Sequence, residues 1–228
     1  IIKTIVMSSV YRQTAAASPA LLAADDQNLL YARGPRFRLS AEGIRDNALA
    51  IAGLINVKPG GPSIRPYQPD GVWTKVGGQR YDYRVSPGDE RYRRGLYVVL
   101  KRGAPYPSFV NFDASARLAC TVKRSRTNTP LQALTLLNDP VYVEAAHALA
   151  TRVLSEQPDA SIDERLQYAF RLCTARVPDA VEGRVLRQLF NAQLKLAQTE
   201  PQRKAIGGFA IPGGHNPVEF AAWYSVST

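Results

Sequence analysis

Residues 123–129 combine basic side chains with the start of a predicted helix. A guanidinium group presents a planar fork of N–H donors that suits carboxylate, sulfate or phosphate oxygens. The free N–H groups at a helix N-terminus favour the same anions. This stretch therefore predicts an anion-binding site. Its expected ligand-binding residues are Arg124, Arg126, Asn128 and Thr129.

A second group of arginines, Arg33, Arg36 and Arg38, lies in a stretch without helical spacing. Alternate residues of an extended chain point to the same side, so Arg36 and Arg38 predict one wall of a polar cleft and are assigned to the anion site. A solvated edge is the open alternative. Tyr11 and Trp73 are candidates for stacking a sugar ring, with a half-buried place in the core as their alternative.

The carboxylates nearest to the arginine-rich motifs are Asp46, Asp113 and Asp139. They support two interpretations. In the first, they pair with Arg124 and Arg126 as clamps inside the fold. In the second, two of them face one cleft as the acid and base of a carbohydrate-active hydrolase. Sequence spacing alone does not decide between a clamp and an enzyme.

The histidines and cysteines predict no metal site. His147 falls on the apolar face of a predicted helix, which is typical of a hydrogen-bonded core residue, and His215 lies in a glycine-rich loop without neighbouring ligands. Cys120 and Cys173 are too few for a four-ligand zinc or iron–sulfur site, and neither belongs to a Cys-x-x-Cys-His haem motif. We expect two free thiols, with Cys173 buried by its helical spacing.

Positive charge is concentrated in the middle of the chain. Residues 31–130 contain 18 Lys and Arg against 7 Asp and Glu, while the rest of the 228 residues holds 11 and 12. These basic residues are scattered among Gly and Pro and form no helical stripe, so nucleic-acid binding is the weaker alternative. An apolar content of 45% suits a buried core, but no apolar run is long enough to predict a membrane span.

Capping residues predict the helices that must position these side chains. In the second half, Thr129, Asp139, Ser161 and Asn216 each precede a predicted helix, and a further helix follows Pro178. The periodicity predicts that four of these helices bury an apolar face. The expected residues of these faces are Leu131, Leu134 and Leu137 in the first helix, Val143, Ala146, Ala150, Val153 and Leu154 in the second, Leu166, Ala169, Phe170 and Cys173 in the third, and Val181, Val185, Leu189, Ala192 and Leu196 in the helix after Pro178.

The first half is less regular. Ser18 and Ser40 predict two helix starts, and residues 79–85 and 96–101 predict short strands with a hairpin near Pro87. The predicted fold is therefore mainly α (α+β). Residues 129–228 form a helical bundle that packs on an irregular Arg-rich region, residues 1–128, within one continuous domain.

Several motifs together resemble one family. They lie at residues 11–14, 33–39, 44–46, 60–63, 66–69, 71–73, 92–97, 124–134, 137–140 and 217–223. In this order they resemble the C-terminal domain of unknown function, of the PSD type, in large planctomycete proteins associated with cytochrome c. The upstream part of that domain is missing, and residues 1–10 have helical spacing, so we expect the chain to be a fragment entered in mid-helix.

The resemblance implies a context more than a reaction. It implies an extracytoplasmic location, periplasmic or secreted, and partners among other modules of the same polypeptide. A c-type haem is expected only in an upstream module, and no cofactor in this fragment. We expect a binding or scaffolding role linked to cytochrome c-type electron transfer, with an anionic polysaccharide as a candidate ligand; the hydrolase and nucleic-acid binding remain alternatives.

Overall fold

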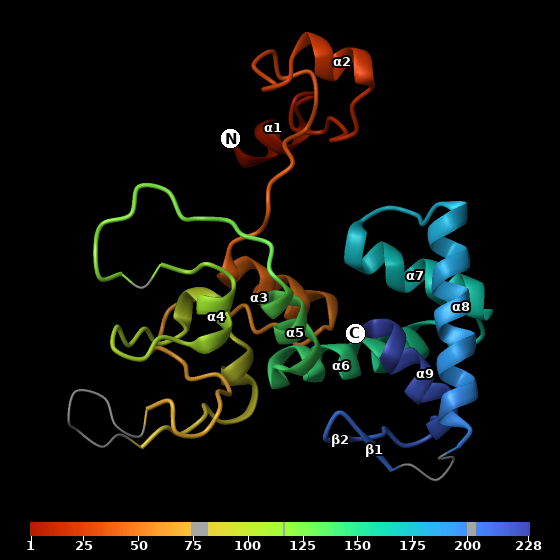
Figure 1. Ribbon diagram of the computed structural model, residues 1–228. Coiled ribbons are helices and arrows are strands. Elements are labelled where there is room, and N and C mark those ends of the chain that lie inside the picture. The colour runs from red at the N-terminus through yellow and green to blue at the C-terminus, as the bar shows by residue number, and fades with distance from the viewer. Residues whose placement is uncertain (74–81, 116, 200–203) are drawn as a thin grey trace. The chain divides into compact units, whose positions relative to one another are not determined.

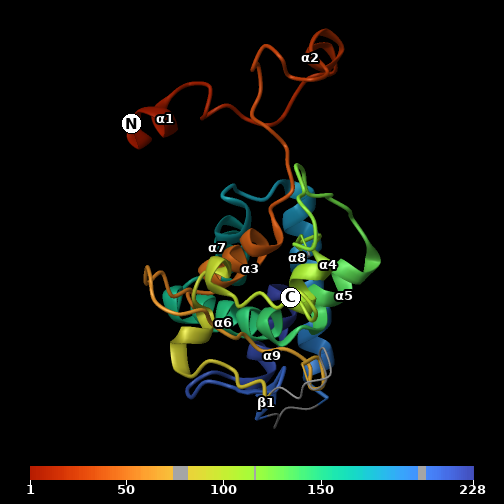
Figure 2. The same cartoon turned by 90° about the vertical axis from the view of Figure 1, so that its left-hand side faces the viewer.

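The structure is a computed structural model that describes residues 1–73, 82–115, 117–199 and 204–228. The chain forms two compact units, Ile1–Leu39 and Ser40–Thr228. The first unit contains two short helices, α1 (Ile2–Met7) and α2 (Pro19–Ala24), and Ser18 caps α2 as predicted. The second unit contains the other described helices (Figures 1 and 2).

The second unit is built mainly from α-helices, which confirms the predicted fold class. Its strands form one two-stranded antiparallel sheet among the described residues, with Ala205 opposite Ala210. Its elements in chain order are α3 (Ala41–Ile51), the 3-10 turns η1 (Gly88–Tyr92) and η2 (Gly95–Tyr97), α4 (Pro107–Asn111), α5 (Pro130–Asn138), α6 (Pro140–Glu156), α7 (Ile162–Thr174), α8 (Ala180–Ala197), β1 (Ala205–Ile206), β2 (Phe209–Ala210) and α9 (Pro217–Ser227). No helix of the described chain is both long enough and apolar enough to cross a membrane.

The predicted helix starts are confirmed by side-chain caps. Thr129 and Ser161 each form a reciprocal capping box with the residue three positions later, at the starts of α5 and α7. Asp139 accepts a hydrogen bond from the Val141 N–H at the start of α6 (3.0 Å), and Asn216 caps α9. Each of these contacts joins residues two or three positions apart, so the sequence predicts it without knowledge of the tertiary packing.

Helix α9 is the centre of the bundle. Phe220, Ala222 and Trp223 are completely buried, and the Trp223 ring lies 4.8 Å from the ring of Phe190 on α8. Figure 1 shows α9 between α6 and α8. Four consecutive residues of α9, 220–223, are buried, so neighbouring elements surround this turn of the helix, with α6 and α8 in contact with it.

Helix α6 joins this bundle to the irregular region. Its second half contributes Ala150 and Val153, both with no exposed surface, to the bundle core. Near its start, Tyr142 belongs to a second core with Phe109 and Phe112, which also includes Ala41 at the start of α3. One helix thus supplies a wall to two hydrophobic cores.

The predicted buried faces of α5 and α8 are wrong. On α5 the buried side chains are Gln132 and Thr135, because Thr135 accepts a hydrogen bond from Asn111 on α4 (2.9 Å). On α8 the buried side chains are Phe190 and Ala197, because the Trp223 ring packs on Phe190. The residues left exposed or at the surface are Leu131, Leu134 and Leu137 on α5, and Val181, Val185, Leu189, Ala192 and Leu196 on α8.

The predicted strands before α4 are also absent from the described residues. Residues 82–85 form no strand, residues 79–81 lie outside the described part of the chain, and the expected hairpin tip is followed by η1. Residues 96–101 make only an isolated parallel bridge from Val98 to Ile64. Alternating apolar residues form a strand only where a partner strand lies alongside, and here the pairing with Ile64 is limited to a single bridge.

Both cysteines are free, but Cys173 is exposed, contrary to the prediction of a buried thiol. It borders a solvent-open cavity of about 280 Å³ beside Leu149 and Thr228. The helical spacing correctly relates Cys173 to the buried Leu166 one heptad earlier, but the last turn of α7 borders this cavity and leaves Cys173 exposed.

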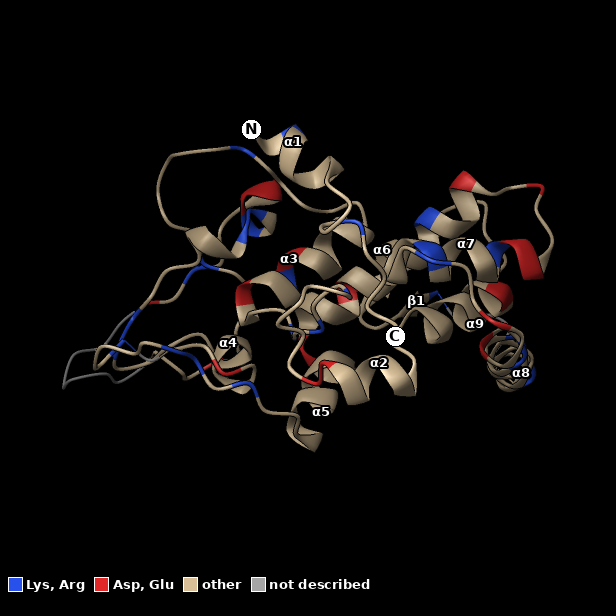
Figure 3. Ribbon diagram, turned by 90° about the horizontal axis from the view of Figure 1, so that it is seen from above, with Lys and Arg blue, Asp and Glu red and all other residues tan. Residues whose placement is uncertain are grey.

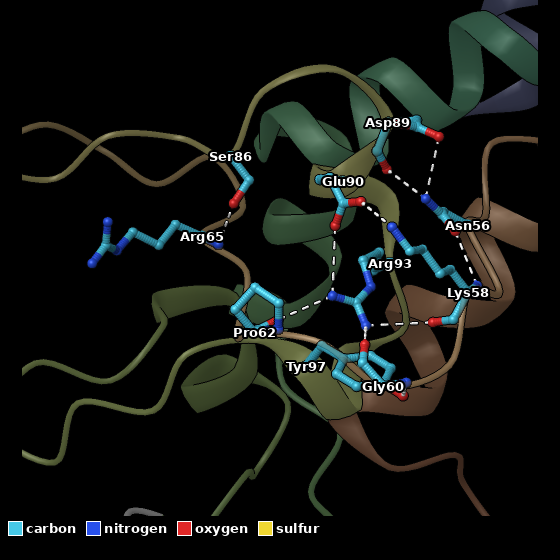
Figure 4. A network of polar contacts seen from close by, with 10 residues as sticks. All are labelled: Asn56, Lys58, Gly60, Pro62, Arg65, Ser86, Asp89, Glu90, Arg93 and Tyr97. Atoms are coloured by element: carbon cyan, nitrogen blue, oxygen red, sulfur yellow. Dashed lines mark hydrogen bonds and ion pairs between the residues drawn. The ribbon is translucent and has the colours of Figure 1, made fainter.

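Two arginines are buried in the irregular region, each with 1% of its side chain exposed. Arg45 on α3 donates from Nη1 to the carbonyl oxygen of Arg93 (2.8 Å) and from Nη2 to that of Arg91 (2.6 Å). Arg93 in turn donates to the carbonyl oxygens of Pro62 (2.9 Å) and Gly60 (Figure 4). These bonds connect three segments that are far apart in the sequence.

The Arg93 guanidinium is held on two further sides. Its carbon lies 3.9 Å from the centre of the Tyr97 ring, and the Glu90 carboxylate is 3.5 Å from Nη1. Tyr97 Oη accepts a hydrogen bond from the N–H of Gly60 (2.7 Å), where φ is +72° and glycine is favoured. A buried charge is tolerated because carbonyl oxygens, a carboxylate and a π face replace water.

Arg93→Lys should lower the free energy of unfolding by about 2–4 kcal/mol, because an ammonium keeps the charge but does not span several carbonyl oxygens. Arg94→Lys is the matched control. The Arg94 side chain is 56% exposed, so this substitution should change stability by about 0.5 kcal/mol or less. Urea unfolding measures both values, and equal losses in the two variants would contradict the role given to Arg93.

Candidate functional site

A cavity of about 600 Å³ lies between α3, η2 and α4, and we name it the arginine cleft. Three guanidinium groups border it, those of Arg94, Arg117 and Arg124, together with the carboxylates of Glu42 and Asp46. The remaining wall is largely apolar. It includes Leu96, Val98, Leu100, Tyr106, Phe109 and Val110.

Arg124 has an intramolecular carboxylate partner. Its Nη1 lies 2.8 and 3.0 Å from the two carboxylate oxygens of Glu42, and the two side chains are 35% and 25% exposed. Glu42 belongs to the first turn of α3, whose N-cap is Ser40. Burial raises the pKa of Glu42, but hydrogen bonds from Arg124 and the backbone outweigh it and hold that pKa below its usual value. Arg124 is thus paired with a carboxylate at the start of α3, and the ligand-binding role predicted for it before α5 stays a prediction.

Asp46 lies one helical turn after Glu42 and also faces the arginine cleft. Its Oδ1 accepts a hydrogen bond from the Gly95 N–H (2.6 Å), and its Oδ2 lies 3.7 Å from Nε of Arg94. Arg45 Nη1 lies 3.7 Å from Oδ1. Asp46 thus connects α3 to η2 and is not a free carboxylate.

The other two predicted acidic residues have structural partners outside the arginine cleft. Asp113 accepts hydrogen bonds from the Thr127 N–H (2.7 Å) and from the Thr127 hydroxyl (2.9 Å). Asp139 caps α6, and burial raises its pKa although the Val141 N–H and Arg45 act in the opposite direction. Of the three, only Asp46 borders the cleft.

The structure separates the residues predicted for the anion site. Arg124 borders the arginine cleft, whereas Arg126, Asn128 and Thr129 are exposed and do not line it. Arg126 and Asn128 have other interactions, and the Thr129 hydroxyl accepts from the Gln132 N–H. The clamp interpretation was right that Arg124 pairs inside the fold, but its partner is Glu42 and not one of the three aspartates.

Arg36 and Arg38 belong to the first unit and are described with it. Arg36 is exposed and Arg38 is half-buried with an interaction of its own. Nearby, Arg33 donates to the carbonyl oxygens of Asp25 and Asp26, 2.6 Å in each case, which closes a loop of this unit.

The two candidates for a stacking platform have different surroundings. Tyr11 is 64% exposed in the first unit. Trp73 is buried, with its Nε1–H donating to the Ala104 carbonyl oxygen (3.0 Å) and its ring 4.9 Å from that of Tyr83. Trp73 therefore takes the alternative place in the core.

His147 lies partly buried between the rings of Phe209 (5.5 Å) and Phe220 (4.9 Å). Burial lowers the pKa of this imidazole. His215 lies 6.0 Å from the same Phe220 ring. Within the described ranges, no three His, Cys, Asp or Glu side chains are grouped as a metal ion requires.

Sequence reasoning missed Glu42, Arg94 and Arg117 as members of the site. The sequence does indicate a place for Glu42, because an acidic residue in the first turn after a Ser cap is favoured by the helix dipole. No sequence pattern places Arg94 and Arg117 at the site, because it is the tertiary packing of the irregular chain that brings them to α3.

Gly95→Ala should lower the free energy of unfolding by about 1–3 kcal/mol, because its new Cβ would lie 2.9 Å from Cβ and 3.0 Å from Cα of Glu42. Gly183→Ala on α8 is the matched control. Nothing lies within 4 Å of that added methyl group, so the variant should gain about 0.5–1 kcal/mol from helix propensity. Thermal and urea unfolding would contradict the close packing of η2 on α3 if Gly95→Ala were neutral.

Residues 1–190 match the model of the PSD1 family, described as a protein of unknown function (DUF1553). No curated protein and no solved structure matches the chain. The matched part extends from the first unit into α8 and includes every residue that borders the arginine cleft. Since it covers most of the 228 residues, the chain belongs to the PSD1 family of proteins of unknown function.

Proposed function

We propose that this chain is a binding module that takes an anionic ligand, an acidic polysaccharide, in the arginine cleft. The observation that carries the proposal is the excess of guanidinium groups at the cleft: Arg94, Arg117 and Arg124 face only Glu42 and Asp46. The volume of about 600 Å³ lies in the range of cavities that hold small ligands.

Arg117 and Arg94 are the groups most available to such a ligand. The Arg117 side chain is exposed and makes no ion pair with a carboxylate of the described residues. Arg94 is 56% exposed, and its contact with Asp46 is long at 3.7 Å. An acidic sugar bound by these two arginines would lie beside the apolar wall, where Leu96 and Val98 can contact the C–H face of the ring.

Glu42 acts in this proposal as a built-in competitor. It occupies Arg124 with two short contacts, so the ligand gains this third arginine only by displacing the carboxylate. Removing the charge of Glu42 should therefore strengthen anion binding, which a purely structural cleft would not show.

The hydrolase alternative has less support. A general acid needs a raised pKa, whereas hydrogen bonds hold the pKa of Glu42 below its usual value. Asp46 already accepts a backbone hydrogen bond, and Asp113 and Asp139 do not border the cleft. Nucleic-acid binding also has less support, because the Lys and Arg positions, blue in Figure 3, are distributed over irregular segments and several helices and are not aligned on one helix.

On the family resemblance we extend the proposal to the cellular context. The module would act outside the cytoplasm, in a planctomycete polypeptide that also carries a c-type cytochrome. Its role there would be to hold a polysaccharide near the redox module, with other modules of the same polypeptide as its partners. Mass spectrometry of the polypeptide isolated from cells, with haem staining, tests this context.

Oligogalacturonate is a suitable probe of the arginine cleft, with neutral oligogalactose as the ligand control. The double variant Arg94→Gln/Arg117→Gln should weaken its binding about 10-fold at low salt, because two charge-assisted contacts are lost. Glu42→Gln should strengthen binding several-fold, since it frees Arg124. Isothermal titration calorimetry measures both effects.

Arg171→Gln/Arg184→Gln on α7 and α8 is the matched control for net charge, because it also removes two charges, and both residues are exposed and do not border the cleft. It should leave the affinity within about twofold of the wild-type value. Equal weakening by this control and by the cleft variant would show that binding follows total charge, and no binding to the wild-type protein would remove the proposal.

A further inference from the structure

One wall of the arginine cleft comes from a segment between α4 and α5 that forms neither helix nor strand, residues 117–126, and we name it the strap. The strap contributes two of the three arginines of the cleft, Arg117 and Arg124. Figure 1 shows this part of the chain, in green, as an open arch between α4 and α5. The fixed part of the cleft, on α3, η2 and α4, contributes Arg94 and both carboxylates.

The strap is closed at its base and has little other support from the backbone. At the base, Asp113 accepts hydrogen bonds from the N–H (2.7 Å) and the hydroxyl (2.9 Å) of Thr127, so the two ends of the segment are held together. Residues 117–125, all of them described, make no backbone–backbone hydrogen bond. Within residues 117–126 every residue is exposed except Arg124, which is half-buried. A loop with joined ends and few buried contacts can open without unfolding the rest of the protein.

A single ion pair ties the strap to the helices. Arg124 Nη1 lies 2.8 and 3.0 Å from the two carboxylate oxygens of Glu42 on α3. It is the one hydrogen-bonded link from residues 117–125 to another element, because the other hydrogen bonds of that range join residues two positions apart. Both side chains are partly exposed, so water and salt weaken the pair and an anion can compete with Glu42 for the guanidinium.

We propose that the strap is the lid of the arginine cleft and that the pair of Arg124 with Glu42 is its latch. This inference rests on the function proposed above, because the anion that releases the latch is the ligand assigned to the cleft. A carboxylate of the ligand takes the place of Glu42 at Arg124, and the strap then closes on the ligand, with Arg117 as its second contact. Ligand binding and the position of the strap are therefore coupled through one guanidinium group.

The two native cysteines allow a direct measurement on the whole chain. Cys120 lies in the strap and Cys173 on α7, both are free and exposed, and both belong to the second unit. With a spin label on each thiol, double electron–electron resonance measures the distribution of distances between the strap and the helical bundle.

Glu42→Gln should broaden this distribution at least about twofold without any ligand, because the latch is lost. Arg124→Gln should broaden it equally, and the double variant should add nothing, because both substitutions remove the same pair. Asp46→Asn is the matched control. It removes the other carboxylate of the cleft, which contacts η2 and not the strap, so it should leave the width unchanged. An unchanged width in Glu42→Gln, or equal broadening in Asp46→Asn, would overturn the latch.

Oligogalacturonate at saturation should narrow the distribution in the wild-type protein and in Glu42→Gln and bring both to the same mean distance, because the strap then closes on the ligand. Binding that calorimetry detects but that leaves the distribution unchanged would overturn the lid while the proposed function stands. Absence of binding would remove the proposed function and the lid together, and the variants without ligand would still decide whether Arg124 and Glu42 form the latch.

Discussion

Hydrogen bonds from buried guanidinium groups to backbone carbonyl oxygens are the interaction on which the irregular half of this protein depends. Between α3 and α4, the described residues form only short 3-10 turns and isolated bridges as regular structure, so few of their carbonyl groups take part in helix or sheet hydrogen bonds. Arg45 and Arg93 supply donors to five of these segments' carbonyl oxygens, those of Lys58, Gly60, Pro62, Arg91 and Arg93. These side-chain hydrogen bonds hold the irregular segments together, as backbone hydrogen bonds would in a sheet.

This arrangement also shapes the arginine cleft. Arg45 holds the backbone of Arg91 and Arg93 against α3, and the next residue, Asp46, borders the cleft. Gly95 can approach the backbone of Glu42 because it has no side chain, and its N–H donates to Asp46. The same contacts that hold the irregular chain on α3 therefore define part of the wall of the arginine cleft.

The sequence was sufficient for features that depend on neighbouring residues. The caps at Ser18, Ser40, Thr129, Asp139 and Ser161 all begin helices, because a cap satisfies N–H groups only two or three residues away. It was insufficient where a choice depended on distant neighbours. Helix α8 carries two apolar stripes, and only the position of α9 decides that the stripe with Phe190 is buried.

The candidate site shows the same limit. The sequence predicted an anion-binding site for Arg124 before the cap of residue 129. The structure pairs Arg124 with Glu42 of α3, a partner 82 residues away that no local pattern indicates. Arg45 was hidden among the apolar residues of α3, whose spacing predicts a hydrophobic face. Arg45 is buried because the carbonyl oxygens of Arg91 and Arg93, in and just after η1, accept its hydrogen bonds. No local pattern of residues predicts these contacts.

The central claim is that Arg45 and Arg93 are held by the backbone, and NMR of a sample with ¹⁵N-labelled arginine tests it most directly. Rotation about the Cζ–N bonds is slow when several N–H groups are held by acceptors and fast when a guanidinium is in water. The account predicts separate, slowly exchanging Nη–H signals for Arg45 and Arg93, and averaged signals for exposed arginines such as Arg184. Averaged, fast-exchanging signals from Arg45 and Arg93 would contradict it.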